Sequence, residues 1–336
     1  MQPVFVKDRR LARVAVAALA TLAACTDTAT APSATLTASD AANAKVDGGP
    51  LPTRYVLPGS SVFPEGIAYD ERTQLVFVSS TTNGTVFRGS ASDETLLPFL
   101  PPGANGRTTA IGLEVDGNGH LFVAGGGTGF VWVYDELSGN LIAALQTGSS
   151  PTFINDIAVD RNGVAYITDS MSPVIYRAVP NGSGGYTIER WRELAGSPIV
   201  YGPGFNLNGM VVAPGDQYLF TVQTNTGKIY RTDVATKEIV QVDVGGATFP
   251  NGDGLWIRGN TLYVLQNQQG IITEIRVNPN QARGTVVSQT TDPSFTVPTS
   301  LVGARGRLLV VNSQFNRRGP GLSPVLPFTV SVVAIP

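Results

Sequence analysis

The sequence has 336 residues with 38 glycines and 23 prolines, 42% hydrophobic residues, only 14% charged residues and a formal net charge of −2. This length suits one large domain or two compact ones, and the hydrophobic content excludes a chain that is disordered throughout. The weak negative charge excludes nucleic acid as a main partner, because phosphate binding needs clustered Lys and Arg residues. Few charges, many glycines and many short apolar runs indicate a β-rich protein with tight turns.

The first 25 residues have the features of a bacterial export signal. A basic stretch that includes Lys7 and Arg13 precedes a short apolar run, 14–24. That run is too short to span a bilayer, which needs about 20 residues. Leu-Ala-Ala before Cys25 resembles the lipobox of bacterial lipoproteins. We therefore expect 1–25 to be a lipoprotein-type signal and Cys25 to be lipidated, with an ordinary signal peptide as the alternative. The protein would then face the periplasm or the cell surface.

Residues 26–52 are mostly Ala, Thr, Ser, Asp and Pro and show no apolar period. This composition predicts a flexible tether, so the domain that follows would touch the membrane only through its N-terminal lipid. Cys25 is the single cysteine of the chain, which excludes a disulfide or thiolate chemistry within residues 53–336.

From residue 53 onward, one unit repeats six times. Each copy begins with an apolar strand that a turn joins to a second apolar strand, and further strands follow. The equivalent apolar positions of the first strands are Ile67, Leu113, Ile157, Met210, Leu255 and Leu301. Their spacings of 46, 44, 53, 45 and 46 residues are typical of propeller blades. The sequence therefore predicts an all-β, six-bladed β-propeller over 53–336, with four antiparallel strands in each blade.

The sixth copy is short of strands. Its third strand is expected at 329–334, and the segment 55–57 is expected to supply its fourth. Closing the ring with strands from both ends of the domain removes exposed sheet edges. Two β-sandwiches are the alternative architecture, but a sandwich gives no reason for six similar periods.

A column of candidate functional residues lies two positions before each equivalent apolar residue. The six copies hold Glu65, Ile111, Asn155, Asn208, Asp253 and Thr299. A propeller directs these positions at one axis, and burying two carboxylates and two amides there is costly unless a cation binds. Four hard oxygen ligands and no His or Cys favour Ca²⁺ over Zn²⁺ or copper, and Mg²⁺ is less favoured. The alternative is that these side chains bond to one another and to channel water.

The segments 64–66, 155–156, 208–209 and 253–256 resemble the metal motifs of the gluconolactonase/regucalcin-like (SMP-30) propellers. Diisopropyl fluorophosphatase and the paraoxonases are more distant relatives of that family. The resemblance covers residues from about 53 to 336. It implies a catalytic Ca²⁺ held by Glu65, Asn155, Asn208 and Asp253, with Asp253 as the base or nucleophile.

The sequence departs from this family at two points. Phe153 stands where the sugar-lactone hydrolases have an arginine that contacts the substrate. The single histidine, His120, falls in a Gly-rich turn, whereas the paraoxonases place histidines near the metal. Both departures bear on the substrate more than on the metal.

Other candidates surround the predicted site. Asp156 lies beside it and is an alternative proton acceptor, or it caps a strand turn. A second column at the ends of the second strands is expected to line the substrate funnel or to support the ligands, unless it only meets solvent: Ser80, Gly125, Asp169, Gln223, Gln266 and Asn312. Four aromatic residues ahead of the first strands are expected to form an apolar pocket or a partner-binding surface: Phe63, Phe153, Phe205 and Phe249.

These features predict a monomeric, calcium-dependent hydrolase of lactones or related small esters. The ester carbonyl would bind the ion, and Asp253 would activate water or attack directly. A non-catalytic, envelope-anchored binding module with a structural calcium ion is the alternative, because propellers host many functions.

Overall fold

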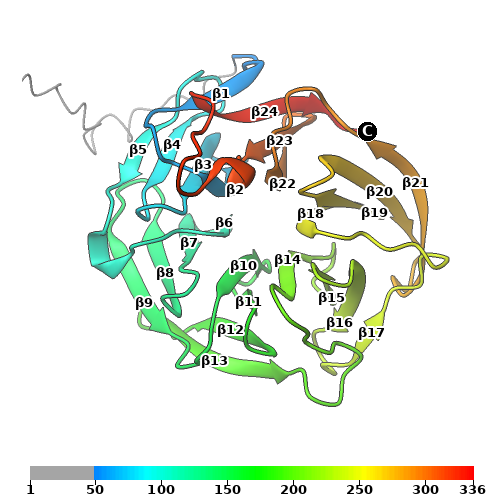
Figure 1. Ribbon diagram of the computed structural model, residues 1–336. Coiled ribbons are helices and arrows are strands. Elements are labelled where there is room, and N and C mark those ends of the chain that lie inside the picture. Colours follow the sequence, from blue (N-terminus) through cyan, green and yellow to red (C-terminus); the bar gives the residue numbers. More distant parts are fainter. Residues whose placement is uncertain (1–48) are drawn as a thin grey trace, which may run out of the picture. The chain divides into compact units, whose positions relative to one another are not determined.

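The computed structural model describes residues 49–336, so the predicted export signal, Cys25 and the tether up to residue 48 lie outside the described residues. In the described range, 24 strands form six four-stranded antiparallel sheets that surround a central axis like blades (Figure 1). This confirms the predicted all-β, six-bladed propeller. The two 3-10 segments in this range are η1 (Ala104–Gly106) and η2 (Phe315–Arg317), and neither has the length or apolar character to cross a membrane.

Each of the first five blades is a continuous run of four strands, numbered outward from the axis. Blade 1 is β2 (Pro64–Asp70), β3 (Leu75–Ser80), β4 (Val86–Ser90) and β5 (Leu97–Leu100). Blade 2 is β6 (Leu113–Val115), β7 (His120–Ala124), β8 (Phe130–Asp135) and β9 (Leu141–Gln146). Blade 3 is β10 (Ile154–Val159), β11 (Ala165–Asp169), β12 (Val174–Pro180) and β13 (Tyr186–Glu193). Blade 4 is β14 (Leu207–Val212), β15 (Tyr218–Gln223), β16 (Lys228–Asp233) and β17 (Ile239–Gln241). Blade 5 is β18 (Gly252–Arg258), β19 (Thr261–Gln266), β20 (Ile271–Val277) and β21 (Gly284–Thr290).

Blade 6 joins the two ends of the described chain. Its strands are β22 (Pro298–Ala304), β23 (Arg307–Asn312), β24 (Phe328–Ala334) and β1 (Arg54–Leu57). The outermost strand, β1, runs antiparallel to β24, with Tyr55 opposite Val330. This confirms the predicted closure, which ties the ring shut by backbone hydrogen bonds. Leu51, expected in the tether, packs against the core between blades 6 and 1.

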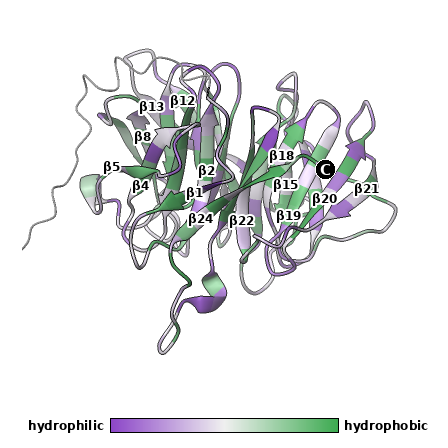
Figure 2. Ribbon diagram, turned by 90° about the horizontal axis from the view of Figure 1, so that it is seen from above, coloured by the Kyte–Doolittle hydropathy of each residue, from purple (hydrophilic) through white to green (hydrophobic). Residues whose placement is uncertain are grey.

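The core lies between the blades. Alternate residues of one strand face opposite neighbours, because side chains in a strand alternate between the two faces of its sheet. In β3, Val76 and Val78 pack toward blade 6, while Phe77 packs toward blade 2. Six such apolar clusters fill the six gaps between blades in the described range. Figure 2 shows the hydrophobic colouring concentrated in the strands and the hydrophilic colouring in the loops.

Candidate active site

The inner strands carry β-bulges at the positions predicted to face the axis. In β2, Pro64 pairs with Ser80 and Ile67 pairs with Val78, so two residues, Glu65 and Gly66, stand opposite one residue of β3. The same shift occurs in β10, β14, β18 and β22. A bulge re-aims side chains at the point where it interrupts the pairing. The bulge therefore turns each candidate residue away from the interface between blades, where the residue two positions later in the sequence packs.

Small residues allow the bulged strands to approach each other closely. A Cβ atom on Gly66 would lie 2.3 Å from the carbonyl oxygen of Ile111 in blade 2. A Cβ atom on Gly209 would lie 2.1 Å from the carbonyl oxygen of Asp253 in blade 5. Only glycine fits this spacing, and the result is that side chains from different blades meet at the axis.

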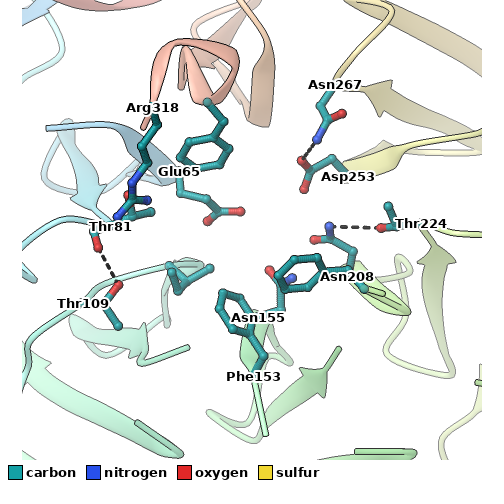
Figure 3. A pocket seen from close by; sticks show the side chains of 13 residues that line it. Glu65, Thr81, Thr109, Phe153, Asn155, Asn208, Thr224, Asp253, Asn267 and Arg318 are labelled. Carbon is teal, nitrogen blue, oxygen red and sulfur yellow. Dashed lines mark hydrogen bonds between the residues drawn. The ribbon is translucent and has the colours of Figure 1, made fainter. Parts of the chain in front are cut away.

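A cavity of about 390 Å³ opens where the inner strands begin. All four predicted ligands line it: Glu65, Asn155, Asn208 and Asp253 (Figure 3). The remaining lining residues are Thr81, Thr109, Ile111, Phe153, Phe205, Thr224, Asn267, Phe315 and Arg318. The sixth member of the column, Thr299, does not line the cavity, because its hydroxyl donates to the backbone oxygen of Glu65 at 2.9 Å.

Hydroxyl groups fix the orientation of the first amide. Ser170 Oγ donates its hydrogen to the carbonyl oxygen of Leu207 at 2.6 Å, so it can only accept from the amide of Asn155. The Nδ2 atom of Asn155 donates to it at 2.8 Å. The oxygen end of this amide is therefore left free, and Asn155 Oδ1 is buried without a hydrogen-bond partner.

The second amide is held in the same way. Thr224 Oγ1 donates to the carbonyl oxygen of Gly252 at 2.7 Å and accepts from Asn208 Nδ2 at 3.1 Å. Across the cavity, Asn267 Nδ2 donates to Asp253 Oδ2 at 2.8 Å (Figure 3). Asn155 and Asn208 are thus each held by a hydroxyl, and Asp253 interacts with the amides of Asn267 and Asn208. This leaves amide and carboxylate oxygens for another partner.

The carboxyl groups are electrostatically uncompensated. Burial, followed by the nearby Asp253 and Asp156, raises the pKa of Glu65 well above its usual value. Burial likewise raises the pKa of Asp253 to about 7, although the hydrogen bond from Asn267 opposes this shift. Glu65 Oε2 is buried and has no hydrogen-bond partner. Asp253 raises the pKa of Glu65, and Asp156 raises the pKa of both, so these buried acids are costly to ionise unless a cation joins them.

The donor set fits a hard divalent cation. The two carboxylates and two amide oxygens are oxygen ligands, and Ca²⁺ takes six to eight such ligands. Among residues 49–336, no group of three or more His, Cys, Asp or Glu side chains could hold a metal ion. A cation in this cavity would therefore depend on Asn155 and Asn208 as much as on the two acids, and it would keep positions open for water or substrate.

The predicted second column lies inside the blades and does not line this cavity. Asp169 accepts hydrogen bonds from the backbone N–H groups of Phe153, Met171 and Ser172. Four of the other five members bond mainly to loops or strands of their own blades: Ser80, Gln223, Gln266 and Asn312. The fifth, Gly125, has no side chain. The side chains of this column hold the loops that precede the inner strands, and the side chains that touch the ligands come one residue later: Ser170, Thr224 and Asn267.

Two of the four predicted aromatic residues line the cavity, Phe153 and Phe205. Their rings contact each other edge to face, with centroids 4.9 Å apart. The other two are buried in the core, since Phe63 packs on Phe328 and Phe249 lies between blades 4 and 5. The expectation that they surround the ion is corrected, because their loops turn these rings inward. Phe315, which the sequence reading did not single out, completes the apolar wall.

Asp156 and His120 also lie away from the cavity lining. Asp156 Oδ2 accepts a hydrogen bond from the backbone N–H of Met210 at 2.8 Å, which ties β10 to β14. Burial raises the pKa of Asp156 to about 7. His120 Nδ1 lies 2.7 Å from the hydroxyl of Tyr186, next to Asp116. This histidine belongs to a polar cluster at the β6–β7 turn, remote in the blade from the strand ends that form the cavity.

Arg318 lines the cavity and was not predicted. It lies in the long loop between β23 and β24, where the repeat pattern is interrupted. No strand periodicity covers this loop, and the one available signal was its unusual length between two paired strands.

Fold and site together define a six-bladed β-propeller with a carboxylate-and-amide cavity at the start of its inner strands. No family model and no curated protein matches the chain. The resemblance to the gluconolactonase-like propellers therefore depends on the motifs, and membership of that family is not shown.

Comparison with solved structures supports the propeller fold. The chain is similar to the major allergen Mala s 1 of Malassezia sympodialis, with 15% identity, a TM-score of 0.64, and coverage of 84% of this chain and 96% of that one. An inactive virginiamycin B lyase from Staphylococcus aureus, with quinupristin, shows 12% identity, a TM-score of 0.57 and coverage of 84% and 87%. A Bacteroides uniformis protein provisionally described as a 6-phosphogluconolactonase shows 14% identity, a TM-score of 0.54 and coverage of 76% and 78%. At these identities the likeness shows the fold alone.

Proposed function

We propose that the cavity is the active site of a calcium-dependent hydrolase that cleaves lactones or related small esters. Glu65, Asn155, Asn208 and Asp253 would hold the cation. When bound, the cation would polarise the ester carbonyl and stabilise the negative charge that develops on its oxygen.

The observation that carries the proposal is the set of three buried oxygens without partners in one cavity: Glu65 Oε2, Asn155 Oδ1 and Asn267 Oδ1. Buried polar atoms are normally hydrogen-bonded, and an unpaired one costs about 1–3 kcal/mol. The hydroxyl of Ser170 turns the oxygen of the Asn155 amide outward from the blade. A cation requires this orientation of the amide, whereas hydrogen bonding among the cavity side chains does not require it.

The remaining cavity residues position and activate the reactants. Phe153 and Phe205 offer an apolar wall for the hydrocarbon part of a substrate and limit the access of water. Asp253 accepts the proton of the water molecule that attacks the ester carbonyl. As the carbon–oxygen ester bond breaks, the same group returns that proton to the departing alcohol oxygen. The hydrogen bond from Asn267 holds Asp253 in place during both transfers.

A carboxylate held by a cation is a weak base, so the two roles of Asp253 need separate tests. Turnover of aliphatic, sugar and aromatic lactones should be measured with calcium and with a chelator. We expect activity to require calcium, and Asp253→Asn to remove turnover even at calcium concentrations that saturate the variant. Turnover that survives in this variant at saturating calcium would remove Asp253 from the chemistry.

The alternative, a binding module with a structural calcium ion, makes a different prediction for the same experiment. Calcium would raise the melting temperature of the protein, and no ester would be cleaved. The export and lipid anchor at Cys25 remain part of the proposal, since that residue lies outside the described range.

A further inference from the structure

Arg318 places one guanidinium group in the cavity that contains the two uncompensated acids. It lies next to Thr81, on the side of the cavity opposite Asp253 and Asn267 (Figure 3). Among the described residues, no carboxylate oxygen lies within 4.0 Å of this guanidinium, in contrast to the paired arginines of the blade surfaces, such as Arg190. The cavity therefore combines a place for a cation with a separate fixed positive charge.

The structure holds this guanidinium in place. Its Nη1 atom donates to Thr81 Oγ1 at 2.9 Å, and its Cζ atom lies 5.5 Å from the centre of the Phe63 ring. Thr81 Oγ1 uses its own hydrogen on the carbonyl oxygen of Phe63 at 2.7 Å, so it accepts from Arg318. A guanidinium has five N–H donors, and one bond to Thr81 leaves the others for a further acceptor.

The loop that carries Arg318 is closed by a side-chain clasp. Gln314 Nε2 donates to the carbonyl oxygen of Val325 at 2.8 Å, and its Oε1 accepts from the backbone N–H of Val325 at 2.7 Å. The loop projects from the ring (Figure 2), and it contains η2. Clasped loops of this kind hold functional side chains on a rigid scaffold.

We propose that Arg318 is a specificity-determining residue that binds an anionic group, a carboxylate or a phosphate, on the substrate of this cavity. Only the statement that the bound molecule is a substrate rests on the proposed function; the binding of an anion by Arg318 does not depend on it. Arginine matches the planar oxygen pairs of carboxylate and phosphate groups, and such charge-assisted bonds are among the strongest in proteins. Phe153 and Phe205 would contact the apolar body of the same molecule.

The experiment uses three probes that share a benzyl group and cannot be hydrolysed as esters. Phenylacetate carries a carboxylate, benzylphosphonate mimics a phosphate, and phenylacetamide is neutral. Calorimetric titrations with calcium present would give a Kd for each. We expect the wild-type protein to bind one anionic probe about tenfold more tightly than phenylacetamide. The stronger of the two anionic probes identifies which anion the site prefers.

Two variants separate Arg318 from the cation and from loop stability. Arg318→Gln should reduce the preference for the anion to less than about twofold while leaving phenylacetamide binding unchanged. Arg317→Gln, a change in the neighbouring exposed arginine outside the cavity lining, should keep the preference. An arginine that only pinned the loop would weaken all three probes equally.

A preference that survives in Arg318→Gln would show that the cation binds the anion, and it would overturn the inference. Equal Kd values in the wild-type protein, or no binding of either anionic probe, would overturn it as well. If every ester is left uncleaved while the Arg318-dependent preference persists, the hydrolase proposal fails and the anion site stands.

Discussion

The hydroxyl of Ser170 offers the sharpest test of how the cavity would hold calcium, because removing it leaves all four proposed calcium-binding residues unchanged. Ser170→Ala deletes the donor to the carbonyl oxygen of Leu207 and the acceptor of the Asn155 amide. Nothing then forces the amide to point its oxygen toward the axis. We predict that the Kd for calcium rises about 10–100-fold, the range found when an outer hydrogen bond to a metal ligand is removed.

Blade 6 provides the matched control. Ser313 occupies the equivalent position, and its hydroxyl donates to the carbonyl oxygen of Val297 at 2.6 Å. The axis position of that blade is Thr299, which is not a proposed ligand. Ser313→Ala should therefore lower stability by about 1–2 kcal/mol and leave the calcium Kd unchanged. Ser170→Ala loses two hydrogen bonds and should cost on the order of 2–4 kcal/mol.

Calcium titration by calorimetry, with urea unfolding of the calcium-free proteins, measures both quantities. Equal changes of the calcium Kd in the two variants would refute the reasoning, because the orientation of the Asn155 amide would then have no role. A large loss of stability without any change in Kd for Ser170→Ala would refute it equally.

Three further predictions concern charge and packing. Burial and neighbouring acids raise the pKa of Glu65, so the ionised group destabilises the folded protein at pH 8. Glu65→Gln should therefore raise the melting temperature of the calcium-free protein at pH 8, and calcium should no longer raise it further. A melting temperature that still rises with calcium in this variant would contradict the prediction. Gly209→Ala forces a Cβ atom to 2.1 Å from a backbone oxygen and should cost about 3 kcal/mol or more in urea unfolding, whereas Gly117→Ala, which meets open space, should cost little. Burial and Asp70 raise the pKa of Glu136 to about 8, so the folded state binds a proton that the unfolded state has already lost. The free energy of unfolding should therefore fall by on the order of a few kcal/mol as the pH rises from 4.5 to 8. Glu136→Gln should make this fall smaller, and an unchanged dependence of the unfolding free energy on pH would disprove the assignment.

The sequence was sufficient for the architecture because the apolar pattern repeats. The spacing of Ile67 and its five equivalents predicted the inner strands, and the short sixth copy predicted that β1 completes blade 6. Strand alternation alone would have placed Glu65 on the same side as Ile67. The bulge that separates them is set by tertiary pairing, although the glycines beside the column were a signal for it.

Site residues at positions that repeat from blade to blade could be predicted from the sequence, and those from irregular segments could not. The four residues predicted as ligands line one cavity because each blade presents the same position to the axis. The supporting column was placed one residue too early, at Asp169 instead of Ser170, because the point where a strand ends determines which side chain turns inward. Phe315 and Arg318 were missed because an irregular loop of blade 6, with no equivalent in the other blades, brings them to the cavity.

The most direct test of the central claim is an anomalous difference map from crystals of the protein grown in calcium. We predict one strong peak in the cavity, contacted by oxygen atoms of Glu65, Asn155, Asn208 and Asp253. A cavity without a peak at millimolar calcium, or a peak bound only to surface carboxylates, would contradict the proposed site.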